Sequence, residues 1–416
     1  MRSFLAHLTL VILIFNHSGF PRSVILSCLL IYTFLVTGFF LKNGYSLKRA
    51  SSTRLFVGLL GLMAFSYLRT NNPNISSQTI FINIYTFIIC SAYYASYLQN
   101  SLRRNTNPFS PIVNVVSFSS LVNILIFVFF GNLRFGAPDL DSVLIKFFTD
   151  ESFRKMNCTI GTLSANHNAV LIAMICPLIF LINRKIWRNA LLLLNITALV
   201  LIDSRGAFFA AIISPGLLYP VWRFRFTYLP LFFAAMLPFQ ALFFTFFLPW
   251  VNENLDFEWV SRNSAELYTA NSRTVIWAEI IDDITQISGA TLVGSGEYGN
   301  LAFKSSVNYL QIFRNFDDSE VKSCHNTYFQ IVFDGGYLTL VVLALVFWQS
   351  MVALAQIKQN KLPLILNMSL FIFLLAGASE VLIGFYYMPI TFVLLLILFY
   401  GVNFHLFRSK NALQVK

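Results

Sequence analysis

The chain has 416 residues, of which 57% are hydrophobic and only 11% are charged, and its formal net charge is +11. A soluble protein of this length needs far more charge to cover its surface, so the composition excludes an ordinary soluble domain. Apolar windows such as 23–41 and 227–251 are long enough to cross a hydrocarbon core of about 30 Å. The sequence therefore predicts an all-α membrane protein with about twelve spans.

Polar breaks divide the chain into apolar segments that predict the spans. In chain order they are 3–16, 22–41, 55–68, 79–98, 112–130, 166–183, 190–203, 207–222, 227–251, 327–350, 362–378 and 381–402. The first segment is short and follows Arg2, as in a signal peptide, but no small-residue cleavage site follows it, so we expect it to be retained. We expect spans one to nine over 1–251, an outer loop domain over 252–326, and spans ten to twelve with a cytoplasmic tail over 327–416.

Charges are distributed asymmetrically over these spans. If the N-terminus is cytoplasmic, more than half of the 29 basic residues fall on the inner face, and all 18 acidic residues fall in outer segments or at the outer ends of spans. The positive-inside rule then places both termini in the cytoplasm. The high net charge therefore reports membrane topology, and we expect no nucleic acid partner, since the inner loops are too short to form a domain.

Two outer connections, 131–166 and 252–325, are much longer than the others. A structureless loop as long as the second is uncommon, so we expect it to fold and to carry function. Within it, Thr274–Ser288 has apolar residues at helical spacing, and Gly289 is a plausible helix stop. The turn-rich segment Gly294–Gly299 is of the kind that lets backbone approach a ligand. The alternative, which is compatible with this one, is an amphipathic helix that rests on the membrane surface with a glycine loop behind it.

Cysteine usage leaves one question open. Three of the five cysteines lie in predicted spans, whereas Cys158 and Cys324 lie in the long outer segments. An oxidising compartment permits a disulfide between these two, but the sequence does not give their separation. No spacing of Cys and His indicates a zinc site.

Ionisable residues at the outer ends of spans are the candidates for chemistry, because a charge at a membrane face is costly unless it is paired, hydrated or used. Arg205 lies in Asp203-Ser204-Arg205-Gly206-Ala207, which links two spans through almost no loop. A guanidinium fixed there can bind a phosphate through two hydrogen bonds, which a lysine does less well. The alternative is an interfacial arginine that reaches lipid headgroups or pairs with Asp203.

Two further candidates flank the predicted loop helix. Arg273 stands at the start of that helix, where free N–H groups and the helix dipole favour an anion. The alternative is that Ser272 caps the helix and Arg273 is solvated. His325 precedes span ten, and a neutral imidazole at a water-accessible membrane face is a competent general base, although a structural role is the alternative. Asn326 is a candidate to orient a sugar or the histidine ring.

Other candidates are weaker. His167, at the start of span six, is placed to line the same outer cavity. Asp139-Leu140-Asp141 resembles a metal-binding pattern, but two aspartates in a polar loop are usually solvated. No phosphate-binding loop, dinucleotide-binding glycine pattern or serine nucleophile elbow is present in the sequence.

Four motifs follow one another along the chain. They are Ser204-Arg205-Gly206-Ala207, Arg273 with Trp277, Gly294–Gly299, and His325-Asn326 followed by Gly335-Gly336. Their order resembles the O-antigen ligase and O-antigen polymerase superfamily, over roughly 166–345 in motif and over the whole chain in layout. These proteins are GT-C-type glycosyltransferases of the bacterial inner membrane. The resemblance implies a GT-C-like fold with a large, partly helical periplasmic loop between spans nine and ten, and an active site that faces the periplasm.

The resemblance also implies substrates and roles. The donor is a glycan on undecaprenyl diphosphate, whose diphosphate Arg205 and Arg273 hold. Ser204, His167 and Asn326 complete the substrate-binding set. His325 takes the proton from an acceptor sugar hydroxyl, so that transfer occurs by direct displacement with inversion. A diphosphate held by two guanidinium groups leaves readily, so neither a metal, another cofactor nor a covalent intermediate is required.

The acceptor separates two alternatives. A ligase passes the glycan to lipid A–core, and a polymerase passes it to another carrier-linked repeat unit. The spacing of Arg205, Arg273 and His325 is closer to that of the ligases, although Asn166-His167-Asn168 also resembles polymerases. A flippase or secondary transporter of lipid-linked glycans is the alternative from another class, but the sequence shows no internal repeat. In each case membrane lipids surround the protein.

Overall fold

The computed structural model describes residues 2–16, 22–43, 53–70, 76–103, 106–131, 133–134, 137–138, 156, 158, 160, 164–202, 204–223, 273–303, 323–355, 361–385 and 388–411. This part of the chain is mainly helical. Turns and irregular segments join the helices, and two short strands of two residues each, β1 (Leu133–Arg134) and β2 (Ala137–Pro138), pair antiparallel. The helices are α1 (Arg2–Phe15), α2 (Arg22–Asn43), α3 (Thr53–Leu68), α4 (Ser77–Arg103), α5 (Ser110–Phe130), α7 (Ala165–Ile179), α8 (Lys185–Ile202), α9 (Arg205–Arg223), α13 (Arg273–Thr285), α14 (Gly289–Val293), η3 (Gly299–Ala302), α16 (Thr327–Ala355), α17 (Lys361–Gly377) and α18 (Met388–Asn411).

The described helices follow the apolar segments of the sequence. Five of them are long and apolar enough to cross a membrane: α2, α4, α5, α8 and α16. Shorter apolar helices lie in α1, α3, α7, α9, α17 and α18, and each of these helices overlaps one predicted span. The predicted span 227–251 lies outside the described residues. The described part of the chain is therefore a mainly helical membrane protein, and the total of about twelve spans stays a prediction.

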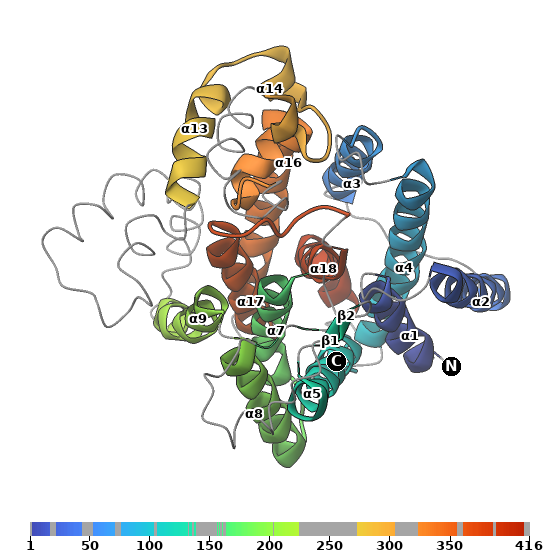
Figure 1. The fold of residues 1–416 in the computed structure, drawn as a ribbon. Coiled ribbons are helices and arrows are strands. Elements are labelled where there is room, and N and C mark those ends of the chain that lie inside the picture. The colour runs from blue at the N-terminus through green and yellow to red at the C-terminus, as the bar shows by residue number, and fades with distance from the viewer. Residues whose placement is uncertain are drawn as a thin grey trace, which may run out of the picture.

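Helix α7 lies inside the bundle (Figure 1). The residues of α7 from His167 to Ile179 are all buried, and α7 packs against α5, α8, α9 and α17. A helix that is apolar all round is expected at such a central position. Helix α16 packs against α3, α14, α17 and α18. The first turns of α7 and α16 meet the connection between α17 and α18, where polar residues gather.

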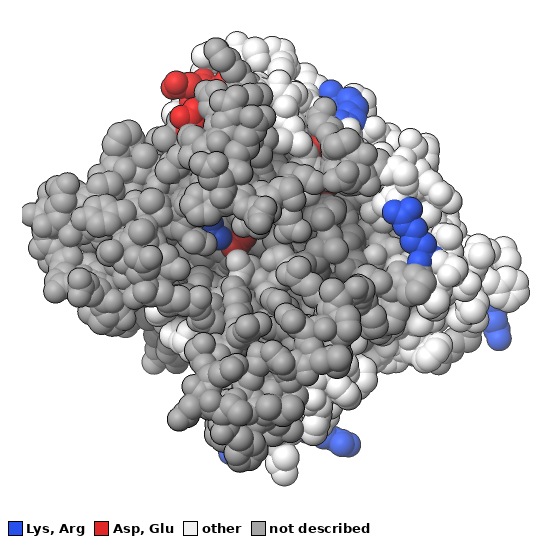
Figure 2. All heavy atoms as spheres, in the orientation of Figure 1, with Lys and Arg blue, Asp and Glu red and all other residues white. Residues whose placement is uncertain are grey.

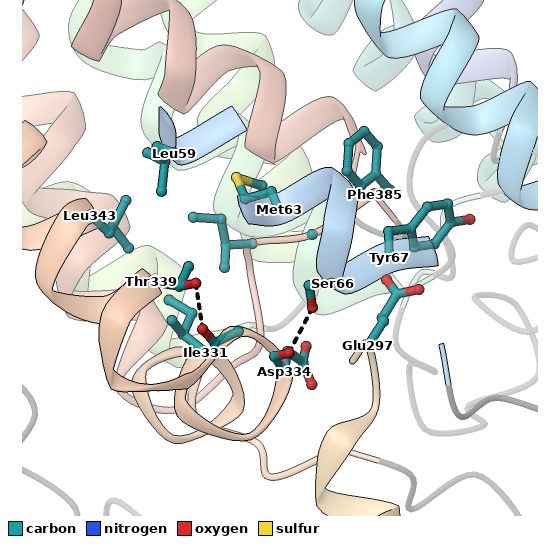
Figure 3. A pocket seen from close by; sticks show the side chains of 13 residues that line it. Leu59, Met63, Ser66, Tyr67, Glu297, Ile331, Asp334, Thr339, Leu343 and Phe385 are labelled. Carbon is teal, nitrogen blue, oxygen red and sulfur yellow. Dashed lines mark hydrogen bonds between the residues drawn. The ribbon is translucent and has the colours of Figure 1, made fainter. Parts of the chain in front are cut away.

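Helix α16 is broken inside its length. Gly336 has φ 74° and ψ 174°, which are not helical values. The carbonyl oxygens next to the break accept hydrogen bonds from the outer loop: Ser295 N–H donates to Phe333 at 2.7 Å, and Gly296 N–H donates to Asp334 at 2.9 Å. Ser66 of α3 also donates its hydroxyl to the Asp334 carbonyl at 2.9 Å (Figure 3). The break is tolerated because these donors replace the helical ones.

The glycine segment Gly294–Gly299 makes this docking possible. Gly294 and Gly296 have positive φ angles of 78° and 96°. A Cβ atom on Gly296 would overlap the carbonyl oxygen of Arg69, and one on Gly299 would overlap that of Phe333. The sequence indicated a backbone approach to a ligand at this segment. In the structure, these glycines instead let the loop approach the backbone of α16 and the C-terminal end of α3.

The predicted loop helix is present as α13, with two differences from expectation. It ends at Thr285, and Gly289 begins the short helix α14, whose Ser288 cap forms a capping box with Thr291. The apolar face of α13 does not rest on a membrane surface: Trp277 and three isoleucines of α13 are buried against Phe329, Val332 and Phe333 of α16. The sequence periodicity identified the face, but not the surface that covers it.

The connection between α17 and α18 departs from the predicted twelfth span. Helix α18 begins at Met388, so Val381–Phe385, which the hydropathy pattern assigned to the span, is not helical. Side chains from other helices satisfy its backbone: Thr327 Oγ1 donates to the Glu380 carbonyl at 2.6 Å and accepts from Leu382 N–H at 3.0 Å. Thr391 Oγ1 accepts from Gly384 N–H at 3.1 Å. These contacts stabilise an irregular segment that local hydropathy does not reveal.

Candidate active site

An ion pair lies where α7, α13, α16 and the 378–385 segment meet. Arg273, the first residue of α13, donates from its guanidinium to the Glu380 carboxylate at 2.6 Å, and the two side chains are 19% and 12% exposed. Asn166 of α7 donates to the same Glu380 oxygen at 3.0 Å. On the face seen in Figure 2, a basic and an acidic side chain lie together in a recess, over the region where α13, α16 and α17 meet in Figure 1.

The segment that carries Glu380 is anchored on both sides. His167 donates from Nε2 to the Val381 carbonyl at 2.7 Å, and Thr327 bonds the residues before and after Val381. Asn326 donates to the Ala378 carbonyl at 2.9 Å. The Glu380 carboxylate is thereby fixed by three helices, although it lies in a segment without regular structure.

His325 belongs to the same group. Its side chain is half-buried, and its backbone φ of 47° lies in the left-handed region that non-glycine residues seldom adopt. Burial lowers the pKa of His325 to about 4; the negative charge of Glu380 opposes this shift, whereas Arg273 and His167 add to it. The imidazole is therefore neutral at neutral pH.

Glu380 is charged, in contrast to the neutral His325. Burial alone would raise the pKa of Glu380, but the basic groups of Arg273, His167 and His325 and the hydrogen bond from Asn166 outweigh it, so the pKa lies below its ordinary value. Glu380 is thus ionised. The site combines a neutral imidazole, which can accept a proton, with a paired carboxylate and guanidinium.

Asn326 has a structural role in this structure. Its Oδ1 atom accepts from the N–H groups of Tyr328 and Phe329 at 2.9 and 3.1 Å, which caps the start of α16. Its Nδ2 atom bonds Ala378, and the side chain is completely buried. Contact between Asn326 and a sugar would require this cap to open.

The Ser204-Arg205 motif begins α9 beside the Glu380 segment. The Ser204 carbonyl accepts from Phe208 N–H at 3.0 Å, and a Cβ atom on Gly206 would lie 3.9 Å from the Ser379 hydroxyl. The backbone at Arg205 is therefore close to the ion pair, while its side chain lies outside the described atoms. Asp203, Ser272 and Asp139-Leu140-Asp141 also lie outside the described residues.

Glu380 is the site residue that the sequence interpretation missed. A signal was present, because Glu380 is the only Asp, Glu, Lys or Arg between Lys361 and Arg408. A single acid between two apolar segments is costly unless it is paired or used. What the sequence does not give is its partner, since Arg273 is more than a hundred residues away along the chain.

The possible disulfide is absent. Cys158 and Cys324 are not bonded to each other. Cys324 is buried in the cluster formed by α13 and α16, whereas Cys158 packs against the separate main core, so the two residues belong to different parts of the molecule. Among the described residues, no three His, Cys, Asp or Glu side chains are grouped as metal ligands.

Comparison with known proteins gives one match. A family model described as O-antigen ligase matches residues 190–344. The matched segment contains Arg205, Arg273 and His325, whereas His167 and Glu380 lie outside it. No curated protein and no solved structure matches the chain. Residues 190–344 of this chain are therefore similar to the O-antigen ligase family.

Proposed function

We propose that this protein is a periplasmic-face, inverting glycosyltransferase that transfers a glycan from undecaprenyl diphosphate to an acceptor sugar hydroxyl. The observation that supports this best is the meeting of Arg273, Glu380 and a neutral His325 at one end of the bundle. Two of these residues lie within the segment matched by the O-antigen ligase family. The family match supports O-antigen ligase-like or polymerase-like activity, and the donor, the acceptor and the mechanism are part of the proposal.

In the proposed reaction, the acceptor oxygen attacks the anomeric carbon from the face opposite the diphosphate. The bond between that carbon and the phosphate oxygen breaks, and the diphosphate leaves with the electron pair. His325 takes the hydroxyl proton, and Arg205 and Arg273 hold the developing negative charge. Ser204, His167 and Asn326 shape the site around the substrates. No metal is needed in this scheme, so transfer in EDTA should proceed at the normal rate.

Glu380 adds a step to this scheme. In the ligand-free protein it balances the charge of Arg273 at 2.6 Å. When a diphosphate binds Arg273, the carboxylate loses part of its pairing and remains beside His325. There it stabilises the imidazolium that forms during transfer, as a carboxylate next to a catalytic histidine does in other enzymes.

The acceptor is proposed to be lipid A–core, as in a ligase, with a carrier-linked repeat unit as the polymerase alternative. The lipopolysaccharide of a deletion strain separates them. Loss of all O-antigen from the core, with long chains still on the lipid carrier, identifies a ligase. Core that carries one repeat unit identifies a polymerase. An unchanged ladder contradicts both, and loss of lipid-linked glycan from the periplasmic face would point to a flippase instead.

Two variants test the residues in that strain. Replacement of His325 by Ala should abolish transfer while the protein still inserts, and near-normal transfer would remove His325 as the base. Arg205→Lys should also fail, because a point charge cannot reproduce the two parallel hydrogen bonds of a guanidinium. Full activity of Arg205→Lys would indicate that only charge balance matters at this position.

A further inference from the structure

We propose that Gln330 positions His325, and that it does so by holding the backbone of Cys324 together with Trp277. The inference rests on the role of His325 in the proposed function. It assigns a part in catalysis to two buried side chains that act through the backbone of the base.

The backbone of His325 needs support from its surroundings. A left-handed φ of 47° at a residue with a Cβ atom is strained, and such strain persists only where neighbouring contacts fix the conformation. On the C-terminal side, Asn326 is fixed by its cap on α16. The backbone of Cys324, on the N-terminal side, must be fixed as well.

Two side chains hold the backbone of Cys324 at its two polar groups, which are the N–H of the peptide before Cys324 and the C=O of the peptide after it. Gln330 Oε1 accepts from Cys324 N–H at 3.0 Å. Trp277 Nε1–H donates to the Cys324 carbonyl at 3.0 Å. Both side chains are buried, with 2% and 1% exposure, so water does not compete for these bonds. Trp277 therefore fixes the peptide between Cys324 and His325, and Gln330 fixes the peptide that precedes it.

Gln330 is itself held by the outer loop. Its Nε2 atom donates to Asp334 Oδ1 at 2.7 Å and to Asn300 Oδ1 at 2.9 Å, and Gly299 N–H donates to the same Asp334 oxygen at 2.9 Å. These partners determine which end of the amide is oxygen, because the reversed amide would face Cys324 N–H with another donor. The network links the loop and the first part of α16 to the base.

Trp277 links the base to the ion pair. It lies four residues after Arg273 on α13, one helical turn away on the same face. A movement of α13 that accompanies a change of partner at Arg273 therefore reaches the Cys324 carbonyl. The position of His325 is in this way tied to the state of the guanidinium that is proposed to bind the diphosphate.

Activity measurements test the role of both residues. Gln330→Leu removes every bond of the amide, and we expect transfer to fall about 100-fold, since a displacement of about 1 Å at a catalytic group has that effect. Trp277→Phe keeps an aromatic side chain but loses the indole N–H and part of the buried ring system, and we expect a fall of about tenfold. The double variant should resemble Gln330→Leu alone, because both changes act on the backbone of Cys324.

Exchange of the amide and the carboxylate between residues 330 and 334 should restore activity. Gln330→Glu places two carboxylates next to each other and should be nearly inactive. Addition of Asp334→Asn restores one donor and one acceptor across the contact, and the pair should recover activity to within a few-fold of the original protein. The control is Asn195→Leu in α8, another buried amide, which bonds Ser117 and Ser120. It should leave both the rate and the pH profile of transfer unchanged.

Two further readouts distinguish positioning from general stability. Loosening of His325 should move its pKa from about 4 toward the ordinary value, so the acid limb of the transfer rate should shift to higher pH in Gln330→Leu. Glu380, Arg273 and His167 face the ring and should remain in place. The Cys324 thiol, which is completely buried, should react with a maleimide at least about tenfold faster in that variant, with the modified peptide identified by mass spectrometry.

The outcomes separate this inference from the proposed function. An unchanged rate of Cys324 alkylation in Gln330→Leu would contradict the proposal that Gln330 holds the backbone of Cys324, and this test does not depend on transfer activity. Faster alkylation with a normal transfer rate and pH profile would show that Gln330 holds Cys324 but does not position His325 as a base. Normal transfer by His325→Ala would instead contradict the proposed function.

Discussion

Charge states at the site depend on contacts that join distant parts of the sequence. The neutral state of His325 and the ionised state of Glu380 follow from burial and from the groups that face them across three helices. The sequence identified Arg273 and His325 from their positions at the ends of predicted elements. It could not identify Glu380 as the partner of Arg273, because only the fold brings α13 and the 378–385 segment together.

The pH dependence of transfer follows from the pKa of His325. A pKa of about 4 keeps the imidazole neutral, so we expect a flat rate between about pH 5.5 and 8, without an inflection near 6.5. Measurement of the initial transfer rate in membrane vesicles checks this expectation, and a half-maximal rate near pH 6.5 would contradict it.

For both His325 and Glu380, a fall in pH lowers the stability of the folded protein. Between pH 6.5 and about 4, the folded protein binds fewer protons at His325 than the unfolded chain, so acidification through this window lowers stability. The contribution of Glu380 is complete above its ordinary pKa of 4.5 and is lost as the pH falls through its lowered value.

Replacement of Glu380 by Gln tests the second role of the carboxylate. The amide can still accept hydrogen bonds from Arg273 and Asn166, but it cannot stabilise an imidazolium. We expect kcat to fall at least about tenfold, with an unchanged or lower KM for the lipid-linked donor, since Arg273 loses its competing anion. An unchanged kcat would confine Glu380 to a structural role.

At the scale of elements, the sequence predicted most helices but not the way in which they are interrupted. Hydropathy extended the last span over Val381–Phe385, because those residues are apolar, whereas the bond from Thr327 that stabilises the irregular segment comes from another helix. The glycines of the loop were identified as a site of close approach. Their partner, the backbone of α16, is a property of the tertiary structure.

The break in α16 predicts a difference between two glycine substitutions. Gly336→Ala places a Cβ atom on a residue with φ 74° and against the Leu292 carbonyl, and should destabilise the protein by about 1–3 kcal/mol. Gly61→Ala in α3, where a Cβ atom meets nothing within 4 Å, should be neutral or stabilise by about 0.5–1 kcal/mol. Thermal unfolding in detergent compares the two, and equal Tm values would contradict the role of Gly336.

At the scale of the whole molecule, composition and charge were sufficient to identify a helical membrane protein and to propose its orientation. The structure confirms the helical class, and the positions of both termini remain predictions. The GT-C-like arrangement also remains a prediction, because no solved structure matches the chain. The arrangement of the helices cannot be read from hydropathy alone, since it depends on packing between spans.

Reporter fusions test the orientation. We expect a fluorescent protein fused after Lys416 to fluoresce, because it stays in the cytoplasm, and an alkaline phosphatase inserted after Gly131 to be active, because that connection faces the periplasm. The reverse pattern would invert the molecule and place His325 on the cytoplasmic side, away from the proposed donor.

The break at Gly336 also determines how the protein responds to the thickness of its bilayer. The apolar stretch Thr327–Leu354 has 28 residues. At about 1.5 Å per residue it would extend for ~42 Å as a straight helix, more than a hydrocarbon core of about 30 Å. The part after the break, from Tyr337 to Leu354, extends for about 27 Å, so it nearly matches the core and a thicker bilayer must thin around it. The part before it stays fixed to the loop, so His325 keeps its place when lipid length changes.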